Sequence, residues 1–184
     1  MLNSNNTISE VPMAERNIWV ERKFNFNLPA WMYCNIVERV RGGPARVEDI
    51  VRGLNNTTLT SRIKDRWSIQ EHIGHLLDLE SLWSTRLDEL TSKAKHLTAW
   101  EETNSATYQA DHNSSSLEEI LTTFRETRAG FVERLDSLDS SLVEQTALHP
   151  RLQTPMRTID LVFFVAEHDD HHLAQITLLK KELS

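Results

Sequence analysis

Two histidines near the C-terminus have the type and spacing of a metal-binding pair. His168 and His172 lie on one stripe of a helical segment that otherwise carries Leu161, Val165 and Ile176. Residues at positions i and i+4 are neighbours on a helix, with Cβ atoms about 5–6 Å apart. An imidazole on an apolar face needs a polar partner, because burying an unpaired polar group costs free energy. One metal ion shared by the two rings would meet that need.

A third histidine, His171, lies beside this pair on a stripe that also carries Glu167. Because that stripe is more polar and is expected to face solvent, His168 with His172 makes a better ligand pair than His168 with His171. The sequence leaves open whether His171 contributes to the site.

A further ligand is expected from a second helix far upstream. His72 lies near the start of that helix, opposite Trp67, and is expected close to its exposed end. His75 lies one turn deeper, on a stripe that continues through Leu79 and Leu82, and is the better candidate for an inward-facing ligand. Packed helices have axes about 8–10 Å apart, so two histidines of one helix and one of its neighbour can bind the same ion.

The predicted set of His75, His168 and His172 has the composition of a catalytic metal site. Three neutral imidazoles commonly hold a divalent metal and leave positions open for water or substrate. Zinc, nickel, copper and iron all accept imidazole, and the sequence does not choose among them. Water bound to zinc has its pKa lowered to about 7 and becomes a hydroxide nucleophile. The alternative is that these histidines are structural, because short motifs carry a real risk of false matches.

Several other reactive residue types are expected to be structural. His96 lies at the end of a helix, and His112 is expected in a solvated loop. His149 precedes the last helix and can edge a pocket, although nothing in the sequence requires it. Cys34 is expected to be a small buried side chain, and the tryptophans are expected in the core.

The composition narrows the classes to which the protein can belong. With 184 residues it is expected to form one domain, residues 1–184, in which residues 1–14 are a mobile tail. A net charge of −7 without a Lys/Arg cluster argues against nucleic-acid binding. The single cysteine excludes an intrachain disulfide. No segment has the roughly 20 apolar residues of a membrane span or the pattern of a secretory signal, so we expect a cytoplasmic protein.

Helical periodicity predicts four long helices that would position these histidines. Ser68 with Glu71 three residues later forms a capping box, which marks the start of the second helix. Residues 98–115 form a long polar connection, as expected between two helices that are not antiparallel neighbours. No strand pattern is present, so the predicted fold class is all-α, a four-helix bundle. The expected helices span residues 28–53 with a break at Gly42-Gly43-Pro44, 68–95, 116–138 and 154–183, the last with Thr154 as its N-cap and Pro155 in its first turn.

Two segments of the chain resemble the DinB/YfiT-like superfamily. The first is Trp67-Ser68-Ile69-Gln70-Glu71 followed by His75-Leu76-Leu77-Asp78-Leu79-Glu80, and the second is His168-x-x-x-His172-Leu173-x-Gln175-Ile176. The order of elements is similar over about residues 25–183. The resemblance implies a bundle with up-down-down-up topology and a long crossover. It also implies a divalent metal, often nickel or zinc, held at one end of the bundle by His75, His168 and His172.

The same resemblance implies small-molecule chemistry. Some members resemble thiol-dependent S-transferases or isomerases that use bacillithiol, mycothiol or glutathione, and others are described as metal-dependent hydrolases. A metal-bound water or thiol would then attack a small electrophilic substrate, in a protein that forms a homodimer as many members do. The alternative is a metal-binding or stress-associated bundle without chemistry of its own. No nucleic-acid or membrane partner is expected.

Overall fold

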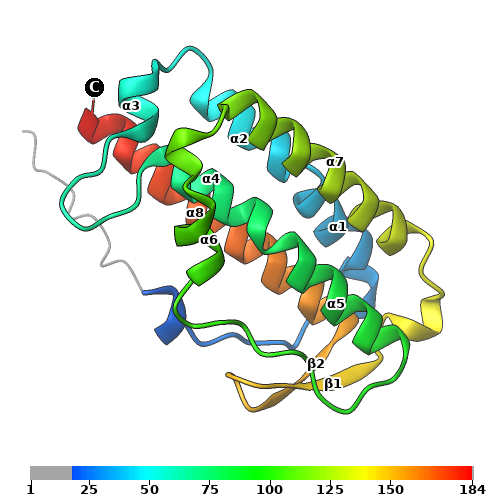
Figure 1. The fold of residues 1–184 in the computed structure, drawn as a ribbon. Coiled ribbons are helices and arrows are strands. Elements are labelled where there is room, and N and C mark those ends of the chain that lie inside the picture. Colours follow the sequence, from blue (N-terminus) through cyan, green and yellow to red (C-terminus); the bar gives the residue numbers. More distant parts are fainter. Residues whose placement is uncertain (1–17, 184) are drawn as a thin grey trace, which may run out of the picture.

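The computed structural model describes residues 18–183, and the mobile tail predicted at residues 1–14 lies outside them. Four long helical rods run side by side in this part of the chain (Figure 1). They are formed by α1 (Tyr33–Arg41) with α2 (Gly43–Val51), α4 (Ile69–Asp78) with α5 (Glu80–Thr91), α7 (Leu117–Asp136) and α8 (Thr158–Leu183). Shorter elements are α3 (Asn56–Thr60), α6 (Ser105–Ala110), β1 (Thr146–His149), β2 (Thr154–Arg157) and 3-10 turns at Trp19–Glu21, Ala30–Met32, His112–Ser114 and Ser140–Leu142. None of the helices described is long and apolar enough to cross a membrane.

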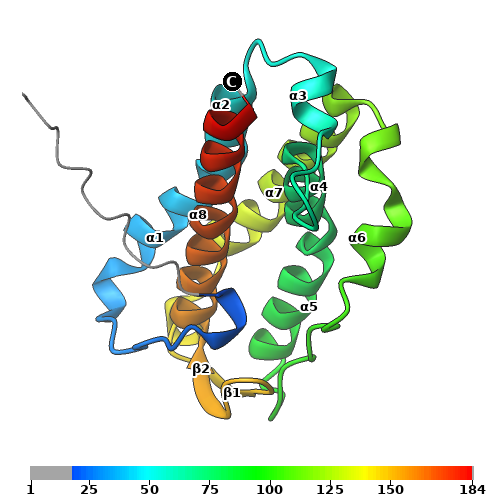
Figure 2. The same cartoon turned by 90° about the vertical axis from the view of Figure 1, so that its left-hand side faces the viewer.

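The four rods have an up-down-down-up arrangement (Figure 1). The α1–α2 rod and α8 run in one direction, while α4–α5 and α7 run in the other. Because two consecutive rods are parallel, the chain must cross from the end of α5 back to the start of α7. The crossover, residues 92–116, carries α6 along the outer side of α4 (Figure 2). The predicted four-helix bundle with a long crossover is confirmed.

The start of α4 is set by the capping box that the sequence predicts. The Ser68 hydroxyl accepts a hydrogen bond from the Glu71 N–H at 3.1 Å, and the Glu71 carboxylate accepts one from the Ser68 N–H at 2.8 Å. Each side chain satisfies a backbone donor that the first turn of a helix would otherwise leave unpaired. The cap therefore fixes the turn of the helix on which the upstream histidines lie.

The break between α1 and α2 lies at Gly42, as predicted. Gly43, next to it, approaches α7 and α8 so closely that a Cβ atom would lie 2.6 Å from Asp169 Oδ2 and 2.9 Å from Arg128 Nη1. Only glycine fits there without displacing one of these side chains. The missing side chain lets the first rod lie against a buried ion pair.

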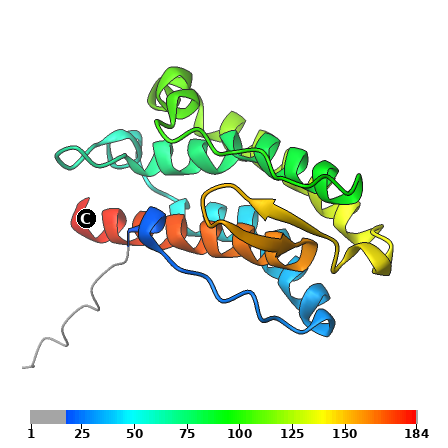
Figure 3. The same cartoon turned by 90° about the horizontal axis from the view of Figure 1, so that it is seen from below.

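The structure differs from the prediction at the start of the last helix. Thr154 and Pro155 belong to β2, which pairs antiparallel with β1, and α8 begins at Thr158. Asp160 takes the capping role, because its Oδ2 accepts the Arg157 N–H at 2.9 Å. Strands of four residues are too short to show a clear alternating pattern, so the sequence carries no strand signal here. The hairpin closes one end of the bundle between α5 and α8 (Figure 3).

Apolar side chains form two clusters inside the bundle, separated along α8 by a buried polar stretch. One cluster includes the apolar residues of 159–166 near the hairpin, and the other includes those of 173–179. Between them, His168, Asp169 and His172 are buried as well. Buried polar groups require partners. This stretch of α8 is therefore the first place to look for a functional site.

Candidate metal centre

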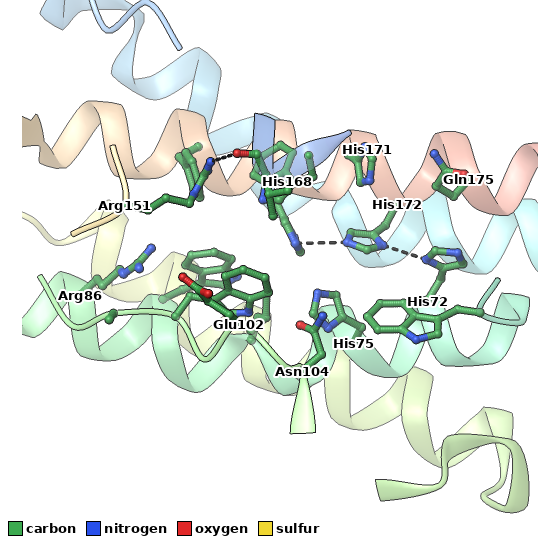
Figure 4. Close-up of a pocket in the computed structure, with 18 of the residues that line it drawn as sticks. His72, His75, Arg86, Glu102, Asn104, Arg151, His168, His171, His172 and Gln175 are labelled. Atoms are coloured by element: carbon green, nitrogen blue, oxygen red, sulfur yellow. Dashed lines mark hydrogen bonds between the residues drawn. The ribbon is translucent and has the colours of Figure 1, made fainter. Parts of the chain in front are cut away.

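The three histidines predicted as metal ligands lie together inside the bundle. His75 on α4 and His168 and His172 on α8 offer ring nitrogens that all lie within 4.8 Å of one another. We call them the histidine triad, and they are 4%, 2% and 5% exposed. The Nε2 atoms of His168 and His172 are 3.2 Å apart (Figure 4). Two nitrogens bound to one tetrahedral zinc ion lie about 3.3 Å apart, so this spacing fits a shared cation.

Burial keeps the three imidazoles neutral. It lowers the pKa of His75 to about 4 and holds the pKa values of His168 and His172 well below their usual range. Neighbouring histidines lower the pKa of each α8 ring further, because two protonated rings at this distance would repel. Neutral imidazole is the form that binds a metal. The triad therefore has the right protonation for a divalent cation at neutral pH.

Other side chains hold the outer nitrogens of two of these rings. His75 Nδ1 shares a hydrogen bond of 3.0 Å with Thr107 Oγ1, and His172 Nδ1 shares one of 2.9 Å with His72 Nδ1. Such contacts fix the ring orientation and leave the other nitrogen for a metal. His168 Nδ1 is buried and has no hydrogen-bond partner among the described residues. This donor set fits a divalent ion such as zinc or nickel.

His72 is a residue of this centre that the sequence analysis places near an exposed helix end, and that placement is wrong. It is 9% exposed, and burial lowers its pKa to about 3. Its ring and that of His75 both pack against Trp67, with centroids 5.4 Å and 4.7 Å away. The reason is that α8 packs over the first turn of α4 and brings His172 against it. The available signal is the i,i+3 spacing of two histidines in one helix.

His171 lies beside the triad but outside it. Its ring centroid is 5.1 Å from that of His172 and 5.6 Å from that of Trp19. It is half-buried and lines the same pocket as the triad. Among the described residues, the nitrogens that converge are those of the histidine triad and not that of His171. The structure thus brings together the α8 pair that the stripe analysis favours.

The triad lines a pocket of about 610 Å³. Aromatic side chains from several parts of the chain form much of its wall, namely Trp19, Trp67, Trp83, Trp100 and Phe164. The expectation that the tryptophans lie in the core is therefore wrong for most of them, and Trp31 is 75% exposed. A cavity of this size with an apolar wall and a few convergent polar groups is typical of a small-molecule site.

Two further expectations about single residues are corrected. His112 is 6% exposed rather than solvated, and its Nε2 lies 2.9 Å from Asp78 Oδ2, because the crossover folds back onto α4. Cys34 is exposed rather than buried, because it lies on the outer face of α1. His149 is 2% exposed and is fully part of the pocket wall. His96 is exposed, as expected.

A second buried polar cluster lies next to the triad, and the sequence analysis does not identify it. Arg128 donates to Asp169 Oδ2 at 2.5 Å and to Glu80 Oε1 at 2.6 Å, and all three side chains are 1% exposed. We call this cluster the ion triad. Burial acts to lower the pKa of Arg128, but the two carboxylates raise it above its usual value. Its signal in the sequence is Asp169, an acid within a helix that otherwise reads as buried.

Comparisons with known proteins identify the family and the fold. The family model of the DinB superfamily matches residues 39–176. Among solved structures, the fold is similar to that of YfiT from Bacillus subtilis, described as a probable metal-dependent hydrolase with an unusual four-helix bundle topology. The two chains are 16% identical, with a TM-score of 0.77 over 88% of this chain and 93% of YfiT. No curated protein matches the sequence.

Proposed function

Since this chain belongs to the DinB superfamily, we propose that it is a metal-dependent hydrolase of a small molecule, with one divalent ion bound by His75, His168 and His172. The observation that carries the proposal is the histidine triad itself. Its three buried, neutral imidazoles have ring nitrogens within 4.8 Å of one another at the wall of a large pocket. Nickel or zinc is the proposed metal, because imidazole suits both.

The protein's own groups provide the setting for hydrolysis. Trp19 and Trp83 pack against His168, with ring centroids 5.0 Å and 5.6 Å away, and exclude bulk water from that side of the ring. Glu102 and His171 line the same pocket and can exchange protons with a bound water (Figure 4). A divalent metal bound by the triad supplies Lewis acidity, which activates water or polarises a carbonyl oxygen.

A thiol-dependent S-transfer is the second candidate function. The observation in its favour is the pocket volume of about 610 Å³, which accommodates a low-molecular-weight thiol beside a small electrophile. The thiol would take the place of water as the nucleophile, and the ligand set would be the same. A bundle that binds metal without chemistry of its own is the remaining alternative.

Metal analysis of the purified protein tests the ligand assignment. We expect about one divalent ion per chain in the wild type, measured by plasma mass spectrometry. His168→Ala and His172→Ala should lose most of it. His96→Ala is the matched control, because it removes an exposed histidine that does not line the pocket. Full metal occupancy in His172→Ala would overturn the assignment.

Turnover assays separate the candidate functions. The metal-loaded protein is incubated with p-nitrophenyl esters, with and without glutathione or another small thiol. The hydrolase assignment is supported if the wild type hydrolyses the ester without a thiol and His172→Ala does not. Product that forms only with thiol moves the assignment to S-transfer. A fully loaded protein that turns over none of these substrates favours the bundle without chemistry.

A further inference from the structure

The pocket has a second polar end that the histidine triad does not explain. Arg86 of α5 and Arg151 of the β1–β2 turn lie at this end on opposite walls, away from His172 (Figure 4). His149, the last residue of β1, lines the pocket with them. The three side chains line the same pocket. Burial first, and then the charges of Arg86 and Arg151, lower the pKa of His149.

These side chains carry N–H groups that lack partners. His149 Nε2 and Arg151 Nη2 are buried and form no hydrogen bond within the described part of the chain. His149 Nδ1 accepts the Leu152 N–H at 3.2 Å, so the neutral ring carries its proton on Nε2. Arg86 donates through Nε and Nη2 to the Thr98 carbonyl at 3.0 Å and 2.9 Å, which leaves Nη1 available. Each of the three side chains that line this end of the pocket thus retains an N–H donor for a ligand.

Among the residues that the structure describes, the two guanidinium groups also lack a counterion. Within residues 18–183, no carboxylate forms an ion pair with Arg86 or Arg151, and Glu102, which lines the same pocket, pairs with neither. Burial lowers the pKa of Arg86 to about 10 despite the opposing effect of Glu89, and the charge of Arg151 adds to the lowering. Both groups remain cations at neutral pH. Arg86 is 1% exposed and Arg151 is half-buried. Removing a cation from water without a negative partner is costly, and an anionic ligand would lower that cost.

An aromatic wall connects this end of the pocket with the metal centre. The Arg86 guanidinium lies 5.6 Å from the Trp83 ring centroid, and that of Arg151 lies 5.9 Å from the Phe164 centroid. The two rings are 6.1 Å apart, and Trp83 reaches His168 at 5.6 Å. A ligand with an apolar body can therefore lie along these rings with one end at the arginines and the other at the triad.

We propose that Arg86, Arg151 and His149 bind an anionic head group of the substrate, a carboxylate or a phosphate, while the substrate's apolar body lies on the aromatic wall. This assignment of a substrate class rests on the proposed function, because it takes the bond that reacts to lie at the histidine triad. Guanidinium groups suit both anions, since each oxygen pair can accept two N–H bonds from one fork.

Binding of small aromatic anions tests the proposal. Phenylacetate, phenyl phosphate and the neutral phenylacetamide are titrated into the protein by calorimetry. We expect saturable binding of at least one anion, and binding of phenylacetamide that is weaker by about tenfold or more. Binding of one anion alone identifies the head group, and binding of neither overturns the proposal. Equal affinity for phenylacetamide would also overturn it.

Arginine variants locate the binding site. Arg151→Gln, and separately His149→Gln, should weaken anion binding, by about tenfold or more for the arginine. Arg66→Gln is the matched control, because Arg66 lines the same pocket but pairs with Glu182. An Arg151→Gln protein that retains wild-type affinity contradicts the proposal, and so does an equal loss in Arg66→Gln.

A metal-free arm separates this proposal from the proposed function. The same titrations are repeated after treatment with a chelator. Binding that persists and still depends on Arg151 assigns the anion to the arginines. Binding that disappears with the metal shows that the anion was a metal ligand and overturns the proposal. Loss of the hydrolase assignment, through absent metal or absent turnover, leaves the binding result intact.

Discussion

Two buried polar clusters occupy neighbouring positions on α8, and they are built in opposite ways. In the ion triad, Arg128 meets Glu80 and Asp169, and all three side chains are closed off from solvent. In the histidine triad the groups are neutral, the cluster opens to a pocket, and His168 Nδ1 has no partner among the described residues. His168 and Asp169 are consecutive in the chain, yet they face different surroundings.

The difference lies in what completes each cluster. A buried network whose members satisfy one another fixes the packing of the elements that carry them, and here it joins α5, α7 and α8. A buried group left incomplete beside a cavity requires another explanation, and a bound ligand is one. We therefore expect the ion triad to contribute to stability and, under the proposed function, the histidine triad to contribute to binding.

The largest loss of stability is expected when the ion triad loses its arginine. Arg128→Met leaves the carboxylates of Glu80 and Asp169 buried without a counterion, so the free energy of unfolding should fall by about 3–5 kcal/mol. Urea denaturation measures it. Arg125→Met is the control on the same helix: it removes a more exposed pair with Glu48 and should cost less than about 1 kcal/mol. Similar losses in the two variants would remove the stabilising role from the ion triad.

The open cluster should contribute stability only through its ligand. Zinc or nickel at 100 times its dissociation constant should raise the wild-type free energy of unfolding by about 2.7 kcal/mol. His172→Ala should show no such rise, because it lacks one of the ligands. Thermal denaturation with metal or with a chelator measures the difference, and His96→Ala should behave as the wild type. A metal-induced rise in His172→Ala would show that the ion binds elsewhere.

The tight fit around the closed cluster gives a smaller effect. In Gly43→Ala the new methyl group would meet Asp169 and Arg128, and we expect a loss of about 2 kcal/mol. Gly130→Ala, on an exposed part of α7 with no atom within 4 Å of the new Cβ, should gain up to about 1 kcal/mol. Chemical denaturation of the two variants side by side measures both. If Gly43→Ala left the free energy of unfolding unchanged, Asp169 and Arg128 could move aside for the methyl group at little cost.

The smallest effect is the loss of stability at lower pH that a buried neutral imidazole causes. Burial lowers the pKa of His149 to about 3, from an ordinary value of 6.5 in the unfolded chain. Between these values the unfolded chain binds a proton that the folded chain does not, so stability falls as the pH drops. From pH 7 to pH 5.5 the wild type should lose on the order of 1 kcal/mol more than His149→Gln. If the urea midpoint fell equally with pH in the two proteins, this prediction would be wrong.

The rods and the histidine triad could be predicted because the signals that specify them are local. The i,i+4 spacing of His168 and His172, and the capping box at Ser68, depend only on residues within one or two helical turns. The bundle topology follows from the family resemblance carried by the same segments.

What the sequence does not reveal depends on contacts between distant segments. His112 is buried because the crossover that carries it folds onto α4, and His72 is buried because α8 packs over it. Residues close in the sequence give no sign of these contacts. The hairpin that brings His149 and Arg151 to the pocket consists of strands too short for a period to be visible. Asp169 is an acid in an apolar helix, but its partner Arg128 lies 41 residues away in the sequence on another helix.

The segment that carries Trp19 comes before the first rod and lies outside the residues 39–176 that match the family. It still forms part of the pocket, because Trp19 contacts His168 and Arg151 donates to the Val20 carbonyl at 2.7 Å. Under the proposed function, the choice of substrate could therefore be changed by exchanging a short piece of chain ahead of the bundle. The rods and their three histidines would remain unchanged while the pocket acquires a new selectivity.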